Sequence, residues 1–274
     1  MFVHASCFPR ESHTDLNRVQ PPRDIKVKRK DLLNEEDILD DLAPDAIEPF
    51  PIDVPEEIRE VTVTRAQLST RFGGSPQDPH PVPRAELLAE HGRDNFMCLN
   101  LMYNPHAPTS PGFPGLSFHP LAFLDDAPPL RRQALFIRLN ANKWRYMGDY
   151  VEEPSSVLSV ERWRRLTPRV RKKWNKGIAT KKWGSLYRAR VSLRRSLGRE
   201  PTRAEIQNAK GPFRDVTQDH LAAAFDSGLE RMRAWTMKCV GYDEELQRIC
   251  VEISRIPPEP AQRSRRRPKR KAKA

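Results

Sequence analysis

The sequence has little cysteine and glycine for its length, and it has no long apolar run. Its 274 residues include four cysteines and 12 glycines, against 26 prolines. No two cysteines have the C-x2-C spacing, which excludes a zinc finger or ribbon, and their low density fits a reducing compartment. No apolar stretch approaches the roughly 20 residues that cross a bilayer. We therefore expect no membrane segment, and the first residues do not follow the pattern of a secretory signal.

The common nucleotide-binding and catalytic motifs are also missing. The sequence contains neither a phosphate-binding G-x-x-x-x-G-K-[ST] loop nor a dinucleotide-binding G-x-G-x-x-G loop, and neither a G-x-S-x-G elbow nor an H-E-x-x-H metal motif. Acidic pairs at 125–126 and 152–153, with Asp149, could hold a metal ion only if folding brought them together. We expect no catalytic residue, no cofactor and no metal site, and the sequence favours a protein that is not an enzyme without excluding one.

Charge is distributed unevenly along the chain. Lysine and arginine number 48 against 36 aspartates and glutamates, a formal net charge of +12. Residues 1–60 carry 15 acidic and eight basic side chains, whereas residues 161–200 carry 15 basic and two acidic ones. Residues 257–274 carry eight basic side chains and one acidic. The positive excess comes from one internal block and one tail, and such blocks predict a polyanionic partner.

Both ends of the chain are expected to be disordered. Residues 254–274 have no apolar periodicity and four prolines. Their basic run fits a nuclear localisation signal, which predicts a nuclear protein and an import receptor as partner. The signal comprises Arg265, Arg266, Arg267, Lys269, Arg270 and Lys271. Residues 1–60 alternate acidic and apolar residues between prolines, which is typical of a disordered segment that binds a protein partner; a solvated linker fits equally well.

Residues 61–253 have the pattern of a single α+β domain. We expect a small β-sheet or hairpin region at about 95–151, followed by a helical C-terminal half. The clearest hairpin is at 135–150, with a reversal at residues 140–143. Capping patterns predict helices that begin after Ser159, Thr202 and Thr217, and the apolar spacing predicts that the last of these runs to about Gly241.

The returning strand of the hairpin carries an aromatic residue at nearly every second position. Trp144, Tyr146 and Tyr150 fall on one face of a regular strand. Aromatic residues with this spacing usually pack in a core. The alternative is a face that stacks on nucleic-acid bases, together with the proline-rich loop at 104–118.

The basic block that follows is interleaved with aromatic residues. This mixture favours contact with phosphates and occasional stacking on bases. A solvated helix face is the alternative, but so many like charges would repel one another without a partner. The candidate nucleic-acid-binding residues are Lys172, Lys173, Trp174, Lys176, Lys181, Lys182, Trp183, Arg188, Arg190, Arg194 and Arg195.

Several motifs in order resemble a known family. They are SxxFGGSPQ (from Ser69), NPHAPTSPGFPGLSF (104–118), LFIRLNANKWRYMGDY (135–150), WGSLYRARVSLRRSLGREPT (183–202) and AFDSGLERMRAWTMKCVGYDEELQ (224–247). Together they resemble the fungal domain of unknown function DUF6697, which is abundant in mushroom-forming basidiomycetes. The resemblance covers about 61–253 and implies one structural unit, without catalytic residues to transfer. The Y-x-G-x-Y stretch alone is loosely similar to SRA/PUA-like domains, which bind modified bases.

These observations predict a nuclear, non-enzymatic module that binds DNA or RNA through its basic helices. Two alternatives stay open at this point. One is a modified-base reader or nuclease-associated domain that uses the aromatic strand. The other is a protein-interaction scaffold that recruits a partner through the acidic N-terminal segment.

Overall fold

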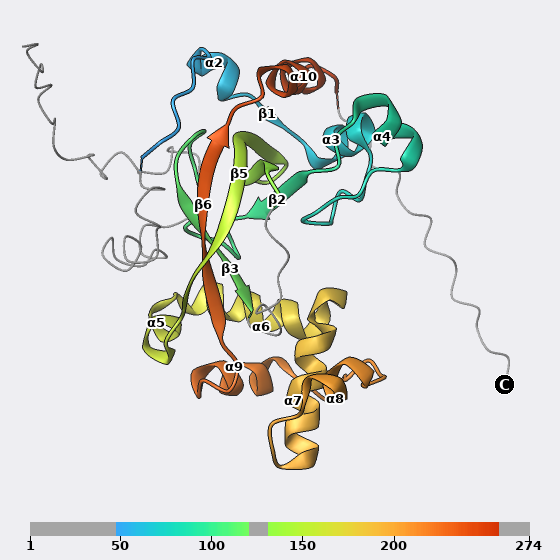
Figure 1. Ribbon diagram of the computed structural model, residues 1–274, viewed down its shortest axis with the longest axis vertical. Coiled ribbons are helices and arrows are strands. Elements are labelled where there is room, and N and C mark those ends of the chain that lie inside the picture. The colour runs from blue at the N-terminus through green and yellow to red at the C-terminus, as the bar shows by residue number, and fades with distance from the viewer. Residues whose placement is uncertain (1–47, 121–130, 258–274) are drawn as a thin grey trace, which may run out of the picture.

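A computed structural model describes residues 48–120 and 131–257, and its centre is a curled sheet (Figure 1). The six strands follow the order β2-β4-β5-β6-β3, with β1 paired to β5, and only β2 and β4 run parallel. The strands are β1 (Thr62–Val63), β2 (Phe96–Asn100), β3 (Gly115–Pro120), β4 (Gln133–Asn140), β5 (Lys143–Val157) and β6 (Met232–Gly241).

Helices gather at the two ends of the sheet (Figure 1). One end carries α2 (Glu56–Arg59), α3 (Arg65–Phe72), α4 (Ala85–His91) and α10 (Glu244–Ser254). The other carries α5 (Val160–Arg165), α6 (Pro168–Thr180), the 3-10 turn η5 (Lys182–Gly184), α7 (Ser185–Leu197), α8 (Arg203–Asn208) and α9 (Gln218–Asp226). The mixed α and β class expected from the sequence is confirmed.

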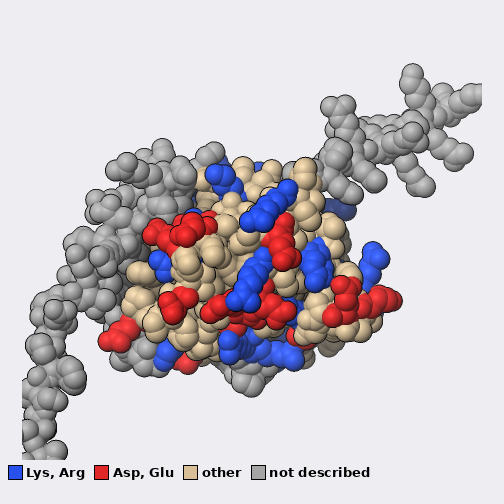
Figure 2. All heavy atoms as spheres, turned by 90° about the horizontal axis from the view of Figure 1, so that it is seen from above, with Lys and Arg blue, Asp and Glu red and all other residues tan. Residues whose placement is uncertain are grey.

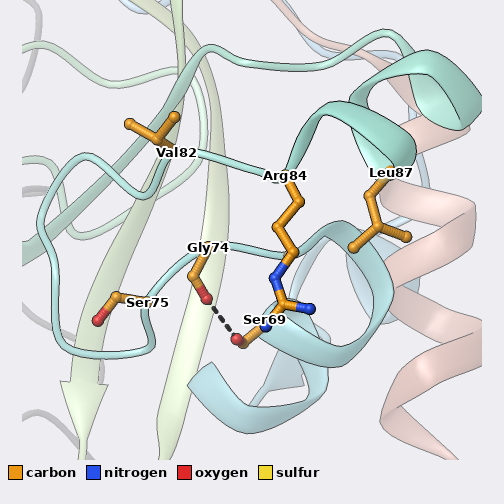
Figure 3. Close-up of a pocket in the computed structure, with 7 residues that line it drawn as sticks. Ser69, Gly74, Ser75, Val82, Arg84 and Leu87 are labelled. Carbon is orange, nitrogen blue, oxygen red and sulfur yellow. Dashed lines mark hydrogen bonds between the residues drawn. The ribbon is translucent and has the colours of Figure 1, made fainter.

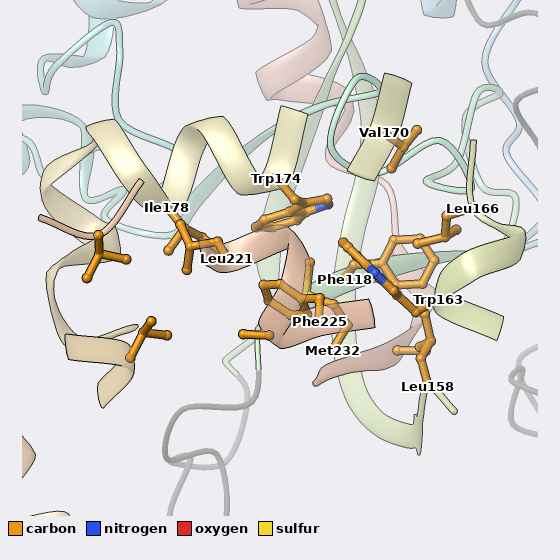
Figure 4. Packing of buried hydrophobic residues seen from close by; sticks show 14 residues of the cluster. Phe118, Leu158, Trp163, Leu166, Val170, Trp174, Ile178, Leu221, Phe225 and Met232 are labelled. Carbon is orange, nitrogen blue, oxygen red and sulfur yellow. The ribbon is translucent and has the colours of Figure 1, made fainter. Parts of the chain in front are cut away.

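Both helix groups pack on the same face of the sheet, which we call the helix-covered face. At one end Phe136 and Tyr146 pack with residues of α3 and α10. At the other end Phe118 and Ala234 pack against the apolar stripes of α5, α6 and α9 (Figure 4). The stripe of α6 consists of Val170, Trp174 and Ile178, four residues apart and therefore on one side of the helix.

The opposite face, which we call the loop-covered face, is filled by chain that has no regular structure. Leu135, Ile137 and Met237 pack there with Leu101 and Ala107. Backbone hydrogen bonds also hold the 104–118 segment against this face. The Gly112 amide donates to the Met147 carbonyl at 2.8 Å, and the Leu116 amide donates to the His106 carbonyl at 2.8 Å. The segment is thus part of the core and ends as strand β3.

The hairpin predicted at 135–150 is confirmed. β4 and β5 pair antiparallel, with Asn140 opposite Lys143, and Asn142 takes the left-handed conformation (φ 61°) that tight reversals need. The strand is not regular, however. Leu135 pairs with Gly148 and Phe136 with Tyr146, so Met147 is an extra residue in β5, a β-bulge.

The helix predicted from Thr217 to about Gly241 is wrong beyond its first turns. The capping box at Thr217 is present, but α9 ends at Asp226 and Gly228 (φ 79°) reverses the chain. Residues 232–241 form β6, which lies between β5 and β3. A strand buried on both faces is nearly continuously apolar, so its pattern cannot be told from that of a buried helix. The C-terminal half therefore also supplies a central strand.

The fold begins before Val61, the start expected from the sequence. The Phe50 amide donates to the Gly112 carbonyl at 2.9 Å, and the Gln247 side chain on α10 donates to the Ile58 carbonyl. These contacts attach residues 50–58 to the domain. Residues 1–47 of the N-terminal segment and residues 258–274 of the basic tail lie outside the described residues.

Candidate nucleic-acid interface

The lysines of α6 and η5 lie at the surface because of the helix they belong to. The Thr167 side chain accepts from the Val170 amide and Pro168 occupies the first position, two features that start a helix. Since Val170, Trp174 and Ile178 face the core, Lys172 and Lys176 point outward and are exposed. Lys181 and Lys182, just after the helix, are exposed as well, and Lys173 is half-buried.

These five lysines have no carboxylate partner among the described residues. Partial burial, together with the nearby charges of Lys176, Lys181 and Arg138, lowers the pKa of Lys173. Every charge that acts on Lys173 in this way is positive. The surface, which we call the lysine surface (Lys172, Lys173, Lys176, Lys181 and Lys182), is therefore a region of uncompensated positive potential.

The arginines of α7, in contrast, are engaged within the domain. Arg194 lies 2.6 Å from a Glu200 oxygen and 3.0 Å from the buried Glu230, and Arg190 lies 2.7 Å from Glu200. Arg195 lies 3.7 Å from Asp215. Hydrogen bonding by Arg194 lowers the pKa of Glu200, so this carboxyl is ionised near neutral pH. These arginines stabilise the packing of α7 and offer less free charge than the lysines.

Arg188 has an internal role. It is buried, and its guanidinium donates to the carbonyls of Ile178 (2.5 Å), Lys181 (2.9 Å) and Pro212 (3.3 Å). The side chain thus ties the end of α6 to α7 and to the segment before α9. The sequence predicts that Arg188 is part of the interface. That prediction rests on its charge, and charge alone does not indicate where a side chain points.

An aromatic cluster borders the lysine surface. Trp174 is buried and its indole N–H donates to the Tyr103 carbonyl at 2.9 Å. The Tyr103 ring centre lies 5.0 Å from that of Trp174 and 6.4 Å from that of Trp183, and the two indoles are 5.9 Å apart, all edge-to-face. Trp183 is 42% exposed, and the Lys173 ammonium lies 5.2 Å from the Tyr103 ring. Tyr103 is not among the candidate residues predicted from the sequence. Only its aromatic side chain and its position directly before the proline-rich loop could have indicated a role.

Gly177 makes this cluster possible. A Cβ atom at this position would lie 2.9 Å from the Trp183 ring and 2.9 Å from the Tyr103 hydroxyl. Because α6 has no side chain there, both rings can lie against the helix. The cluster thus holds Trp183 in place with one side open to solvent.

The strand aromatics do not form an open stacking face. Tyr146 and Tyr150 are 1% and 0% exposed, and the Tyr150 hydroxyl donates to the Phe113 carbonyl of the covering loop at 2.7 Å. Trp144 is half-buried, with the Arg65 guanidinium 5.4 Å from its ring. The extra residue Met147 also turns Tyr146 and Tyr150 to opposite faces of the sheet, so the single face expected from the period-two pattern does not exist.

Other candidates from the sequence are separated or lie outside the described residues. Asp149 accepts from Tyr146 and Arg132, whereas Glu152 accepts from Ser117, so the two carboxylates have different partners. Among residues 48–120 and 131–257, no group of three ligands could hold a metal ion, and no helix is long and apolar enough to cross a membrane. Residues 125–126 and the basic run at 265–271 are not described.

The opposite end of the molecule has a different surface. Seen from above, where α2 and α10 lie, basic and acidic side chains are interspersed (Figure 2). A recess of about 520 Å³ lies between α3 and α4, lined by Ser69, Gly73, Gly74, Ser75, Val82, Arg84 and Leu87 (Figure 3). The Ser69 hydroxyl is held by the Gly74 carbonyl at 2.6 Å. This recess contains one ionisable side chain, Arg84, and no acid–base pair.

Comparison with known proteins gives one match. A family model described as a domain of unknown function (DUF6697) matches residues 62–252. No curated protein and no solved structure matches the chain.

Proposed function

The chain belongs to the DUF6697 family, a domain of unknown function, and we propose that it binds nucleic acid through the lysine surface. The observation that supports this function is the contrast between two parts of one basic block. Three arginines of α7 are paired with Glu200, Glu230 and Asp215, whereas the five lysines have no carboxylate partner among the described residues. Unpaired lysines grouped on one surface suit the phosphate backbone.

The aromatic cluster favours nucleic acid over other polyanions. Trp183 is half exposed and backed by Trp174 and Tyr103, so its ring is presented in a fixed position beside the lysines. Stacking of a base on such a ring stabilises binding by about 1–3 kcal/mol. Sulfated or carboxylated polymers offer charge but no base, so this ring would add nothing to their binding.

Charge reversal tests the proposal. The variant Lys176→Glu/Lys181→Glu/Lys182→Glu should lose most of its affinity for a labelled oligonucleotide in fluorescence anisotropy. The matched control is Arg84→Glu/Arg248→Glu/Arg255→Glu, which makes the same change in net charge just before α4, on α10 and just beyond α10. If both triple variants bind equally, the lysine surface is not the binding site.

Salt dependence provides a second measure. If all five lysines contact phosphates of a duplex, the logarithm of the affinity should fall with the logarithm of salt concentration with a slope of about −4 to −5. The lysine variant should show a shallower slope, and the control variant should keep the slope of the unmodified chain. Sequence-independent binding with these slopes is expected for both DNA and RNA.

A nuclear location and an import receptor belong to the same proposal. They rest on the basic run at 265–271, which lies outside the described residues. A fluorescent fusion that lacks this run should leave the nucleus, whereas retention there would remove this part of the proposal. Recruitment of a protein partner by the acidic N-terminal segment stays a prediction from the sequence.

A further inference from the structure

The loop-covered face carries a group of polar side chains where β3, β6 and β5 lie side by side. Ser117 and His119 belong to β3 and Glu152 to β5, with β6 between them. Ser117 is opposite Trp235 and Glu152 is opposite Met237, and residues two apart on a strand share a face. The three side chains therefore meet on one face although Glu152 is 35 residues from Ser117.

These side chains form a hydrogen-bonded relay. The Ser117 hydroxyl donates to Glu152 Oε1 at 2.5 Å, and the same hydroxyl oxygen lies 3.2 Å from His119 Nε2. Burial by itself raises the pKa of Glu152, but its interactions with His119 and Ser117 outweigh burial and the pKa is lowered. The carboxylate is thus ionised, and the only proton of the Ser117 hydroxyl is committed to it.

The relay determines which nitrogen of His119 carries the proton. Because the Ser117 oxygen can only accept from His119, Nε2 must be the protonated nitrogen of the neutral ring. The other nitrogen, Nδ1, then has a free lone pair. Ser117 is fully buried and Glu152 is 6% exposed, whereas the His119 side chain is 32% exposed. The relay thus leads from a buried carboxylate to a basic nitrogen on a side chain that solvent can reach.

A second observation points to a ligand beside His119. Trp235 is 3% exposed, and its indole N–H has no hydrogen-bond partner among the described residues. Its ring centre lies 5.4 Å from that of His119. A buried N–H without an acceptor is costly, and such groups often serve a ligand or a reaction. Acyl transfer combines a general base with N–H donors that stabilise the oxyanion, and here the His119 ring packs edge-on against the indole that carries the unpaired N–H.

We propose that His119 is the general base of a hydrolytic site for ester substrates, with the Trp235 indole as oxyanion donor. Ser117 and Glu152 are positioning residues that act through His119. In the reaction His119 Nδ1 takes a proton from water while the water oxygen bonds to the carbonyl carbon. The ester C–O bond then breaks, and the imidazolium gives its proton to the departing alkoxide, which leaves as the alcohol. The carboxylic acid that remains releases its proton to solvent. The Glu152 carboxylate, whose Oε1 lies 3.6 Å from His119 Nε2 and accepts from Ser117, balances the positive charge of the imidazolium. This site does not depend on the proposed binding of nucleic acid.

Hydrolysis of p-nitrophenyl acetate by the full chain tests the activity. The rate above buffer should fall at least tenfold in His119→Asn, and about tenfold in Glu152→Gln and Ser117→Ala. Glu152→Asp, which keeps the carboxylate, should recover part of the rate. His91→Asn on α4 is the matched histidine control and should keep the full rate. An unchanged rate in His119→Asn overturns the proposal.

Nuclear magnetic resonance separates the relay from a loss of folding. Two-bond ¹H–¹⁵N correlation at a pH where the ring is neutral should show His119 protonated at Nε2 in the unmodified chain. In Ser117→Ala this preference should weaken while the amide spectrum remains that of the folded domain. A ring protonated at Nδ1 in the unmodified chain contradicts the relay and removes the basis of the proposal.

Discussion

Tyr146 and Tyr150 lie on opposite faces of the sheet although both belong to β5. The extra residue Met147 shifts the alternation of side chains between them. Tyr146 packs with Phe136 on the helix-covered face and donates to Asp149 at 2.7 Å, and Tyr150 packs with Leu135 on the loop-covered face. One strand thus supplies a large aromatic residue to each core.

Replacing either tyrosine should therefore lower the stability of the fold. Tyr146→Ala and Tyr150→Ala should each lower the free energy of unfolding by about 3–5 kcal/mol, because each removes a fully buried ring. Urea denaturation followed by circular dichroism measures this change. Trp144→Ala, at a half-buried ring, is the control and should cost less. A stable Tyr146→Ala protein that has lost nucleic-acid binding would instead support a base-stacking strand.

Variants of Arg188 and Lys182 should affect different properties, the first the stability of the fold and the second the binding of nucleic acid. Arg188→Ala removes a buried guanidinium that three carbonyls share, and should lower the free energy of unfolding by roughly 2–4 kcal/mol. Lys182→Ala changes an exposed side chain and should weaken oligonucleotide binding with stability unchanged. Thermal unfolding and anisotropy, measured on both variants, give the comparison. If Arg188→Ala unfolds like the unmodified chain, the internal role of Arg188 is wrong.

Gly177→Ala should disturb the aromatic cluster. Alanine is the better helix former by about 1 kcal/mol, so an unhindered site would become more stable. Here the new methyl group would press on Trp183 and Tyr103, and we expect a lower unfolding temperature and a red-shifted Trp emission. Lys176→Ala, on the exposed side of α6, serves as the control. A gain in stability at Gly177 would show that the rings are not held against the helix.

Glu205 should make stability depend on pH in the acid range. Hydrogen bonds from the Arg199 side chain and the Thr202 amide lower the pKa of Glu205 from 4.5 to about 2. Because the folded-state pKa lies below the unfolded one, the stabilisation is complete above pH 4.5 and is lost as pH falls toward 2. The unfolding temperature should therefore decrease over this range, and less so in Glu205→Gln. Equal pH profiles for the two proteins would contradict the assignment.

Local features of the fold follow from short stretches of sequence. The capping box of Thr202 and Glu205 spans four consecutive residues, and the hairpin turn at 140–143 joins neighbouring strands. The helix at 85–91 ends where Gly92 takes the left-handed conformation. In each case the interacting groups are close in the chain, so residue type and spacing are sufficient to predict the contact.

The candidate sites depend on contacts between distant segments. The sequence indicates that residues 161–200 are strongly basic, but a charge count does not reveal which side chains have partners. Glu230, which lies 3.0 Å from Arg194, comes from the segment that precedes β6. The same holds for Tyr103, which reaches Trp174 and Trp183 from the turn after β2.

The sequence by itself determined the low cysteine content, the two basic regions, the hairpin and the helix starts, because these depend on composition or on neighbouring residues. Only the tertiary structure decided that 232–241 is a central strand, since an apolar run buried on both faces fits helix and strand alike. It also brought Ser117, His119 and Glu152 together across β6. The physical reason is that the partners of a buried or charged side chain are chosen by packing between segments far apart in the chain.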